Sequence, residues 1–195
     1  MSTTIKSLGP IILAALILAA AGWWIFWTYF DTYHLAAVKD GVLYRDGVRH
    51  IHEFDLAARK THVKTVVLLV DDREIAQPPF TDELAYCKAH GIDFVRLPVP
   101  LGGWPQGIQI SRFLDIATDP ARQPVLVHCA QGVRRTGIMV AAYQISVLKF
   151  DKDRAIAAIQ GFGHSQRTTG DIKRFIETYD PETKQMMRQL PQSVE

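Results

Sequence analysis

The sequence predicts an α/β fold: a central, mostly parallel sheet flanked by helices and preceded by one transmembrane helix. Short runs of β-branched and aliphatic residues alternate with segments whose apolar residues recur at helical spacing, the pattern of a parallel sheet covered on both faces. Hydrophobic residues make up 48% of the 195 residues, enough for one core of ordinary size. We therefore expect an anchor over residues 1–30, a linker over 31–40, one folded domain over 41–182 and a tail over 183–195.

The N-terminal segment is typical of a membrane span. No charged residue occurs from Ser7 to Phe30, and twenty helical residues rise about 30 Å, the thickness of the hydrocarbon core. Aromatic residues gather at its C-terminal end, as in an interfacial belt: Trp23, Trp24, Trp27 and Tyr29. A signal peptide cleaved after Ala19–Ala21 is the alternative, but it would leave a mature terminus crowded with aromatic residues. We expect a single-pass membrane protein, and basic residues on both flanks leave the side of the domain open.

Four strands are predicted in chain order. They cover Gly41–Gly47, Thr65–Val70, Phe94–Val99 and Val125–His128. The second is a continuous β-branched and aliphatic run, which favours a strand buried on both faces, and the fourth should be central. Parallel sheets bind ligands at the carboxyl ends of their strands, so the residues that follow these strands should meet at one edge.

Apolar spacing predicts the helices between and after the strands. They cover His52–Lys60, Thr81–His90, Ile108–Ala117, Ile138–Phe150, Asp153–Gln160 and a last helix with the stripe Ile172, Phe175, Ile176 and Tyr179. Phe80, Leu84 and Cys87 share one face of the second helix, so Cys87 is expected in the core. The stripe of the last helix is expected to pack on the core rather than to bind a ligand.

Composition excludes several functional classes. The net charge of +2 provides no bulk basic field of the kind that nucleic-acid binders carry, so no nucleic-acid partner is expected. The two cysteines, Cys87 and Cys129, form no CxxC pair, which argues against a zinc site or a disulfide framework. We expect neither a metal nor a cofactor.

The stretch Pro124–Gly137 contains the candidate chemistry. A strand ends at Cys129, five residues separate Cys129 from Arg135, and a helical run follows Thr136. A strand, a tight loop and a helix N-terminus build an anion cradle from backbone N–H groups, and the same positive potential favours a cysteine thiolate. Arg135 can approach the same anion as a planar, two-pronged donor. A buried strand-end cysteine is the alternative, and it leaves the offsets of Arg135 and Thr136 unexplained.

The combination of His128, Cys129, Gly132, Arg135 and Thr136 resembles the signature of the cysteine-dependent phosphatases, the tyrosine and dual-specificity group. The soluble part as a whole, from about residue 42 to residue 180, is similar to a dual-specificity phosphatase domain of the atypical type found in plants and fungi, with bacterial relatives. The other matching pieces are Leu43–Arg45, Pro124–Cys129 and Arg174–Asp180.

This resemblance implies a mechanism and assigns roles to the loop. Cys129 as thiolate would attack phosphorus and form a cysteinyl-phosphate that water then hydrolyses. Thr136 would ease the departure of the sulfur, and His128 would orient the loop from behind. The substrate phosphate would be held by the loop residues Ala130, Gln131, Gly132, Val133, Arg134 and Arg135, mainly through electrostatic stabilisation.

The sequence departs from the family pattern at the general acid. The family usually has an Asp on a mobile upstream loop, whereas Leu97–Gly107 contains no carboxylate and has Gln106 after Trp104-Pro105. A positioned acid typically contributes about 10²–10⁴-fold, so slow turnover is expected unless another group serves. The candidate substitutes are Asp71, Asp72 and Glu74; a solvated turn at a strand end is the alternative interpretation.

The expected partners are a phosphorylated protein or a small phosphorylated substrate, and the membrane through the N-terminal helix. We expect hydrolysis of phosphotyrosine, phosphoserine or phosphothreonine in proteins. Arg134 is the one additional cation of the loop, which weakens the alternative of an inositol (pyro)phosphate. A lipid phosphate and a catalytically weak phosphate-binding pseudophosphatase remain further alternatives. His164, Gln166 and Arg167 are candidate pocket residues or simply a polar surface loop.

Overall fold

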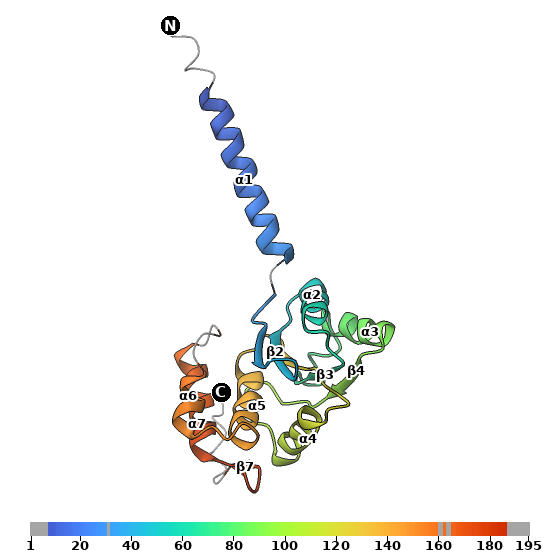
Figure 1. Ribbon diagram of the computed structural model, residues 1–195, viewed down its shortest axis with the longest axis vertical. Coiled ribbons are helices and arrows are strands. Elements are labelled where there is room, and N and C mark those ends of the chain that lie inside the picture. Colours follow the sequence, from blue (N-terminus) through green and yellow to red (C-terminus); the bar gives the residue numbers. More distant parts are fainter. Residues whose placement is uncertain (1–7, 31, 160–161, 163–164, 187–195) are drawn as a thin grey trace. The chain divides into compact units, whose positions relative to one another are not determined.

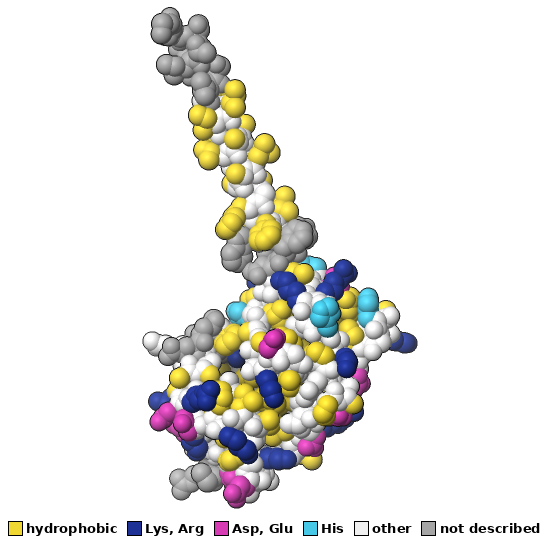
Figure 2. All heavy atoms as spheres, in the orientation of Figure 1, with side chains coloured by type: hydrophobic (Ala, Val, Ile, Leu, Met, Phe, Trp, Pro, Cys, Tyr) yellow, Lys and Arg dark blue, Asp and Glu magenta, His cyan; other side chains and the backbone are white. Residues whose placement is uncertain are grey.

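The computed structural model describes residues 8–30, 32–159, 162 and 165–186 (Figure 1). The chain divides into two units, residues 1–31 and residues 32–195, which we describe separately. The first contains α1 (Leu8–Phe30). Its segment Gly9–Phe26 is long and apolar enough to cross a membrane, a property that a signal sequence can also have. Hydrophobic side chains lie exposed along this helix (Figure 2).

The second unit is built on a five-stranded sheet in the order β1-β2-β5-β3-β4. Its strands are β1 (Ala36–Lys39), β2 (Leu43–Gly47), β3 (Thr65–Leu68), β4 (Asp93–Arg96) and β5 (Val125–Cys129). All neighbouring pairs are parallel except β1 with β2, so the predicted mostly parallel sheet and the central position of β5 are confirmed. Residues 36–39 lie in the expected linker, and the structure corrects that interpretation because they pair with β2 as an edge strand.

Six helices of this unit follow the sequence prediction closely. They are α2 (Ile51–Thr61), α3 (Phe80–His90), α4 (Gly107–Thr118), α5 (Arg134–Ser146), α6 (Lys152–Ala157) and α7 (Gln166–Thr178). Helix α5 begins four residues earlier than expected, so that Arg135 and Thr136 lie in its first turn. The predicted stripe of the last helix is fully buried in the core, although Tyr179 belongs to β6 (Tyr179–Asp180).

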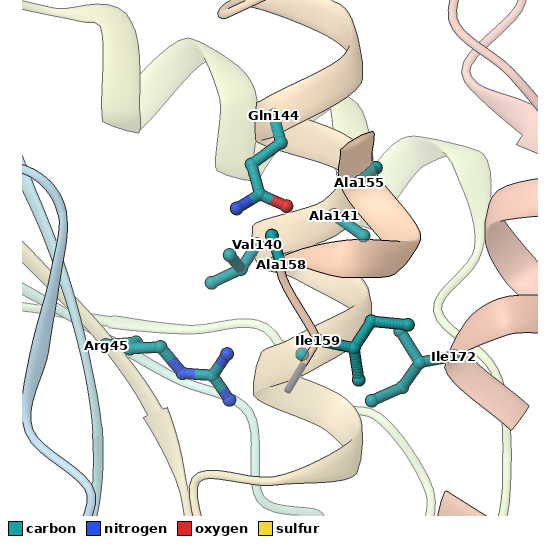
Figure 3. A pocket seen from close by; sticks show the side chains of 9 residues that line it. Arg45, Val140, Ala141, Gln144, Ala155, Ala158, Ile159 and Ile172 are labelled. Atoms are coloured by element: carbon teal, nitrogen blue, oxygen red, sulfur yellow. The ribbon is translucent and has the colours of Figure 1, made fainter. Parts of the chain in front are cut away.

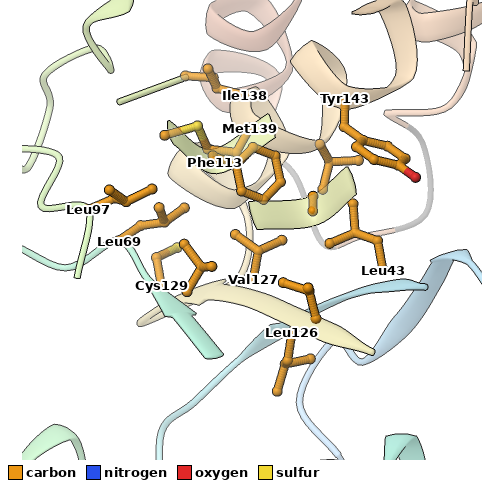
Figure 4. Packing of buried hydrophobic residues seen from close by; sticks show 14 of the residues in the cluster. Leu43, Leu69, Leu97, Phe113, Leu126, Val127, Cys129, Ile138, Met139 and Tyr143 are labelled. Carbon is orange, nitrogen blue, oxygen red and sulfur yellow. The ribbon is translucent and has the colours of Figure 1, made fainter. Parts of the chain in front are cut away.

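The sheet has two differently packed faces, because successive residues of a strand point to opposite sides. Val127 and Cys129 lie on the side of Phe113 from α4 and Met139 from α5, whereas Leu126 points the other way (Figure 4). His128 lies on the face covered by α2 and α3, where its ring contacts Phe54.

Helix α3 differs from the prediction in one respect. Phe80 and Cys87 are buried as expected, but Leu84 is 47% exposed and the neighbouring Glu83 is fully buried. At the C-terminus, β6 pairs with β7 (Gln185–Met186), so the start of the expected tail forms a two-stranded hairpin. Residues 187–195 of that tail lie outside the described residues.

Candidate active site

The candidate nucleophile loop, residues 130–133, lies between the end of β5 at Cys129 and the start of α5 at Arg134. Cys129 is 3% exposed, Arg135 is 5% exposed and the Thr136 side chain is fully buried. Helix α5 has no side-chain cap at its N-terminus. The first N–H groups of a helix that no side chain caps are available to bind an anion.

The surroundings of Cys129 favour its thiolate. Burial would raise the pKa of the thiol, but the charge of Arg135, the Thr136 hydroxyl and the N–H groups of Thr136 and Gly132 outweigh it, so the pKa lies below its ordinary value. The Thr136 hydroxyl makes no hydrogen bond of good geometry. Its effect on the sulfur is therefore a dipole close by rather than a formed bond.

Arg135 is held by a carboxylate from another strand end. Its Nη2 donates to Glu74 Oε1 at 2.7 Å and its Nη1 donates to Glu74 Oε2, a bidentate pair, and Nη1 also lies 3.3 Å from the Val99 carbonyl oxygen. The hydrogen bonds from Arg135 keep the pKa of Glu74 below its usual range despite partial burial. Glu74 therefore orients Arg135 and is ionised, which is the wrong state for a proton donor.

The other two candidate acids lie in the same turn. Asp71 accepts hydrogen bonds from the N–H groups of Glu74 and Arg73, which lower the pKa of its carboxyl. Asp72 is exposed and forms an ion pair with Arg96 at 2.6 Å. This acidic turn lies beside Arg135, as expected from the sheet edge, but in the arrangement of a strand-end turn in which Glu74 pairs with Arg135 and Asp72 pairs with Arg96.

The guanidinium of Arg134 is bound by other groups of the protein. Its Nε donates to Asp171 Oδ2 at 2.8 Å and its Nη2 donates to the Gly102 carbonyl at 3.1 Å, while Gly103 accepts from Nη1. Trp104 lies under the guanidinium, with its ring centroid 5.0 Å from Cζ. Arg134 thus ties the loop that lacks the usual Asp to the start of α5, and Asp171 offsets the charge that the sequence assigned to the phosphate.

His128 belongs to a buried acidic cluster behind the loop. Its Nε2 lies 2.7 Å from Glu83 Oε1, and both side chains are fully buried. Burial would lower the pKa of His128, but Glu83, Asp46 and the Cys129 sulfur outweigh it and raise this pKa. Asp46 is fully buried and neither of its carboxyl oxygens has a hydrogen-bond partner, so burial raises its pKa well above the usual value.

The outer side of the loop is fixed by residues that precede α2. The Val48 N–H donates to the Ala130 carbonyl at 3.0 Å, the His34 ring nitrogen Nδ1 lies 2.8 Å from the Gln131 carbonyl, and Arg45 Nη2 donates to the Gly132 carbonyl at 2.6 Å. Gly132 has a φ of +67°, and a Cβ there would lie 2.3 Å from the Asp46 carbonyl oxygen. Only glycine fits this contact.

Several of these residues were not predicted from the sequence to belong to the site. Glu83, Asp46 and His34 had no sequence signal, and Arg45 entered only as part of a matching tripeptide. Of the candidate pocket residues, Gln166 and Arg167 lie in α7, and His164 lies outside the described residues. Within the described residues, no group of three or more His, Cys, Asp or Glu side chains is placed to hold a metal ion.

Comparison with known proteins gives a consistent result. A family model described as "DSP-PTPase phosphatase fused to NAD+ Kinase" matches residues 58–177. The dual specificity protein phosphatase TpbA of Pseudomonas aeruginosa is 30% identical over 123 residues, 62% of this chain and 52% of TpbA. Inositol diphosphatase SIW14 of Saccharomyces cerevisiae is 24% identical over 151 residues, 72% of this chain and 49% of SIW14.

The fold is shared with solved structures. The SIW14 catalytic core superimposes with a TM-score of 0.66 at 20% identity, over 79% of this chain and 89% of that core. The chain spans about half the length of each of the two full-length relatives above.

Proposed function

The chain belongs to the DSP-PTPase phosphatase family, and we propose that it hydrolyses phosphate monoesters through a cysteinyl-phosphate intermediate. The observation that carries this proposal is Cys129: it is buried, the pKa of its thiol is lowered, and it is the last residue of β5, just before the loop that leads to the uncapped N-terminus of α5. An uncharged core cysteine would have a raised pKa instead, as burial gives Cys87, whose pKa is about 12.

The proposed reaction has two displacements at phosphorus. In the first, the Cys129 thiolate forms the P–S bond as the P–O bond of the ester breaks, and the leaving oxygen takes up a proton. In the second, water forms a new P–O bond, loses a proton, and releases the thiolate and inorganic phosphate. Arg135 and the N–H groups of the loop stabilise the charge on the equatorial oxygens in both steps, which is the electrostatic contribution expected to dominate.

The supply of the first proton is the weak point of this reaction. Asp71 and Glu74 have lowered pKa values, and the carboxylate-free loop is fastened to Arg134. We propose that turnover depends on the acidity of the leaving group, with good aryl leaving groups cleaved far faster than alkyl ones. If Asp71, Asp72 or Glu74 nevertheless donates a proton, replacing it with its amide should lower the rate by about 10²-fold and remove the basic limb of the pH profile.

The proposed substrates are phosphorylated proteins. TpbA is named as a dual specificity protein phosphatase, and the loop around Cys129 offers little charge beyond Arg135, since Asp171 engages Arg134. SIW14 is named as an inositol diphosphatase, so an inositol (pyro)phosphate is the second candidate. A phosphate-binding protein with weak catalysis is the third, favoured by the missing acid.

One experiment tests the reaction and the substrate class. The full chain is assayed against a small aryl phosphate, phosphopeptides, inositol pyrophosphates and phosphoinositides, with Cys129→Ser as the matched control. Turnover that falls at least tenfold in Cys129→Ser supports the covalent mechanism, and residual activity above about a tenth of the parent rate contradicts it. Phosphate binding without turnover of any substrate would favour the pseudophosphatase.

We also propose that α1 anchors the domain to a membrane. Its length and apolar composition support this, as does the exposure of its side chains. Removal of residues 1–30 should transfer the protein from the membrane to the soluble fraction with activity retained. Mature protein that starts near Gly22 would show that the segment is a signal peptide instead.

A further inference from the structure

The three successive carbonyls of the nucleophile loop are each held by a donor from residues 34–48. Val48 N–H, the His34 ring and the Arg45 guanidinium engage Ala130, Gln131 and Gly132, respectively. Carbonyls that point outward turn the N–H groups of the same peptides inward, where a phosphate would lie. Val48 donates from its backbone and His34 is half-buried, whereas Arg45 brings a charged side chain that is buried.

Arg45 carries a charge into the interior. It is 3% exposed, its Nε has no hydrogen-bond partner, and its Cζ lies 3.8 Å from the centroid of the Phe162 ring. Among the described residues, no Asp or Glu lies within ion-pair distance of it. An uncompensated buried charge is costly, so this arrangement needs an explanation beyond packing.

The space around Arg45 is too small for a ligand. The guanidinium projects from β2 toward α5 into a pocket that is apolar except for Arg45 and Gln144 (Figure 3). The cavity has a volume of about 10 Å³, room for roughly one water molecule. Arg45 therefore acts on its protein neighbours.

Arg45 and Cys129 lie on the same face of the sheet. In the parallel register, Arg45 is opposite Val127 and Gly47 is opposite Cys129, so the odd-numbered residues of both strands point toward α5. Burial lowers the pKa of Arg45 to about 10, and the Cys129 sulfur is the negative group that opposes this shift. The guanidinium therefore stays charged at neutral pH.

We propose that Arg45 is a positioning residue of the phosphate-binding loop. Its guanidinium holds the Gly132 carbonyl outward, and it supplies the Cys129 thiolate with a second buried positive charge in addition to that of Arg135. This inference rests on the proposed function, because it names what prepares the same nucleophile. Arg45 does not touch the phosphate; it acts through the Gly132 peptide and through the field at the sulfur.

Three substitutions in the full chain separate the two contributions. Arg45→Met removes the charge and the donor, Arg45→Gln keeps a donor without charge, and Arg45→Lys keeps the charge. The matched control is Arg122→Met, because Arg122 pairs with Asp93 far from the loop and is 41% exposed. The pKa of Cys129 is measured from the pH dependence of iodoacetamide alkylation, read by mass spectrometry of the peptide that contains Cys129, and orthovanadate affinity from protection against alkylation.

The thiol pKa should rise by about one unit in Arg45→Met and Arg45→Gln and stay near the parent value in Arg45→Lys, as expected for one nearby charge. Vanadate affinity should fall about tenfold in Arg45→Met, with no change in Arg122→Met. If Arg45→Met does not fold, the difference between the Gln and Lys variants decides. Equal thiol pKa values in those two variants would overturn the inference.

These readouts do not require turnover. A parent protein that alkylates with a low thiol pKa but hydrolyses no phosphate ester would contradict the proposed function and leave the role of Arg45 intact. An active parent whose thiol pKa and vanadate affinity are unaffected by all three substitutions would contradict the role of Arg45 alone.

Discussion

His128 and Cys129 are adjacent in the chain, yet their side chains lie in opposite electrostatic surroundings. Cys129 faces α5 with Arg135 and Arg45, and these positive groups favour its negative form. His128 faces α2 and α3, where Glu83 favours its positive form, while burial raises the pKa of the neighbouring Asp46. The alternation of side chains along β5 thus places a thiol with a lowered pKa and an imidazole with a raised pKa one residue apart, each with its charged neighbours on its own side of the sheet.

This difference between the two faces of β5 explains how charged groups can surround the strand end without destabilising the fold. On the nucleophile face the charge of Arg135 lowers the pKa of the thiol that the proposed reaction uses. On the other face the partners are fully enclosed, so their role is to hold the strand end in place. Substitutions on the first face should therefore change chemistry, and those on the second should change stability more than chemistry.

The largest effect is expected from Arg135→Lys on the nucleophile face. A lysine keeps the charge but cannot make the planar, two-pronged contact with Glu74 or with a phosphate, so kcat/KM should fall by about 10²-fold or more. Steady-state kinetics with an aryl phosphate measure this, and Arg122→Lys is the control. Activity within about threefold of the parent would mean that the positive charge alone, without the bidentate hydrogen bonds of an arginine, is enough to stabilise the phosphate.

A smaller effect on activity and a clear effect on stability are expected from Glu83→Gln on the acidic face. Removal of one partner from a buried pair should lower the free energy of unfolding by about 3 kcal/mol. Because the pKa of His128 is raised in the folded state, the pair contributes most below the ordinary pKa of histidine and loses its contribution as the pH rises through the raised value.

The loss of unfolding free energy in Glu83→Gln should therefore be larger near pH 6 than near pH 9. Urea unfolding across this range measures it, and Glu177→Gln, at an exposed position that is 52% accessible, is the control. A deficit that does not change with pH would show that His128 is neutral throughout and that the two faces differ less than we infer.

The smallest effect is expected from Asp46→Asn. The buried carboxyl has a raised pKa, so the parent loses stability as the pH rises from the ordinary Asp pKa toward the raised one, because the unfolded chain ionises first. Asparagine does not ionise, and the variant should equal or exceed the parent in stability, with a larger gain at pH 7 than at pH 4.5.

Thermal unfolding at these two pH values measures the gain, with the exposed Asp115→Asn as the control. A variant that is less stable than the parent at both pH values would place an ionised Asp46 in a pair with His128. The acidic face would then hold two carboxylates against one imidazolium.

The parts of the site that are local in the chain could be predicted from the sequence alone. Cys129, Gly132, Arg135 and Thr136 lie on one strand, one loop and one helix start, and an anion cradle needs only consecutive backbone N–H groups and one returning side chain. The parallel sheet and its central strand followed for the same reason, since apolar runs and their spacing report burial directly. For the anchor, composition over twenty residues suffices to predict a candidate span.

The distant groups that surround this loop could not be predicted, because packing between separate elements brings them there. The contacts join residues far apart in the sequence: Glu83 and His128 are 45 residues apart, Glu74 and Arg135 are 61 apart, and Arg45 and Gly132 are 87 apart. No periodic pattern in the sequence predicts such contacts. Helical spacing placed Leu84 in the core, but the structure buries Glu83 instead, because a buried imidazole gains more from a carboxylate than from another apolar side chain. Side-chain charges act through space, so their counter-charges are set by packing rather than by sequence order.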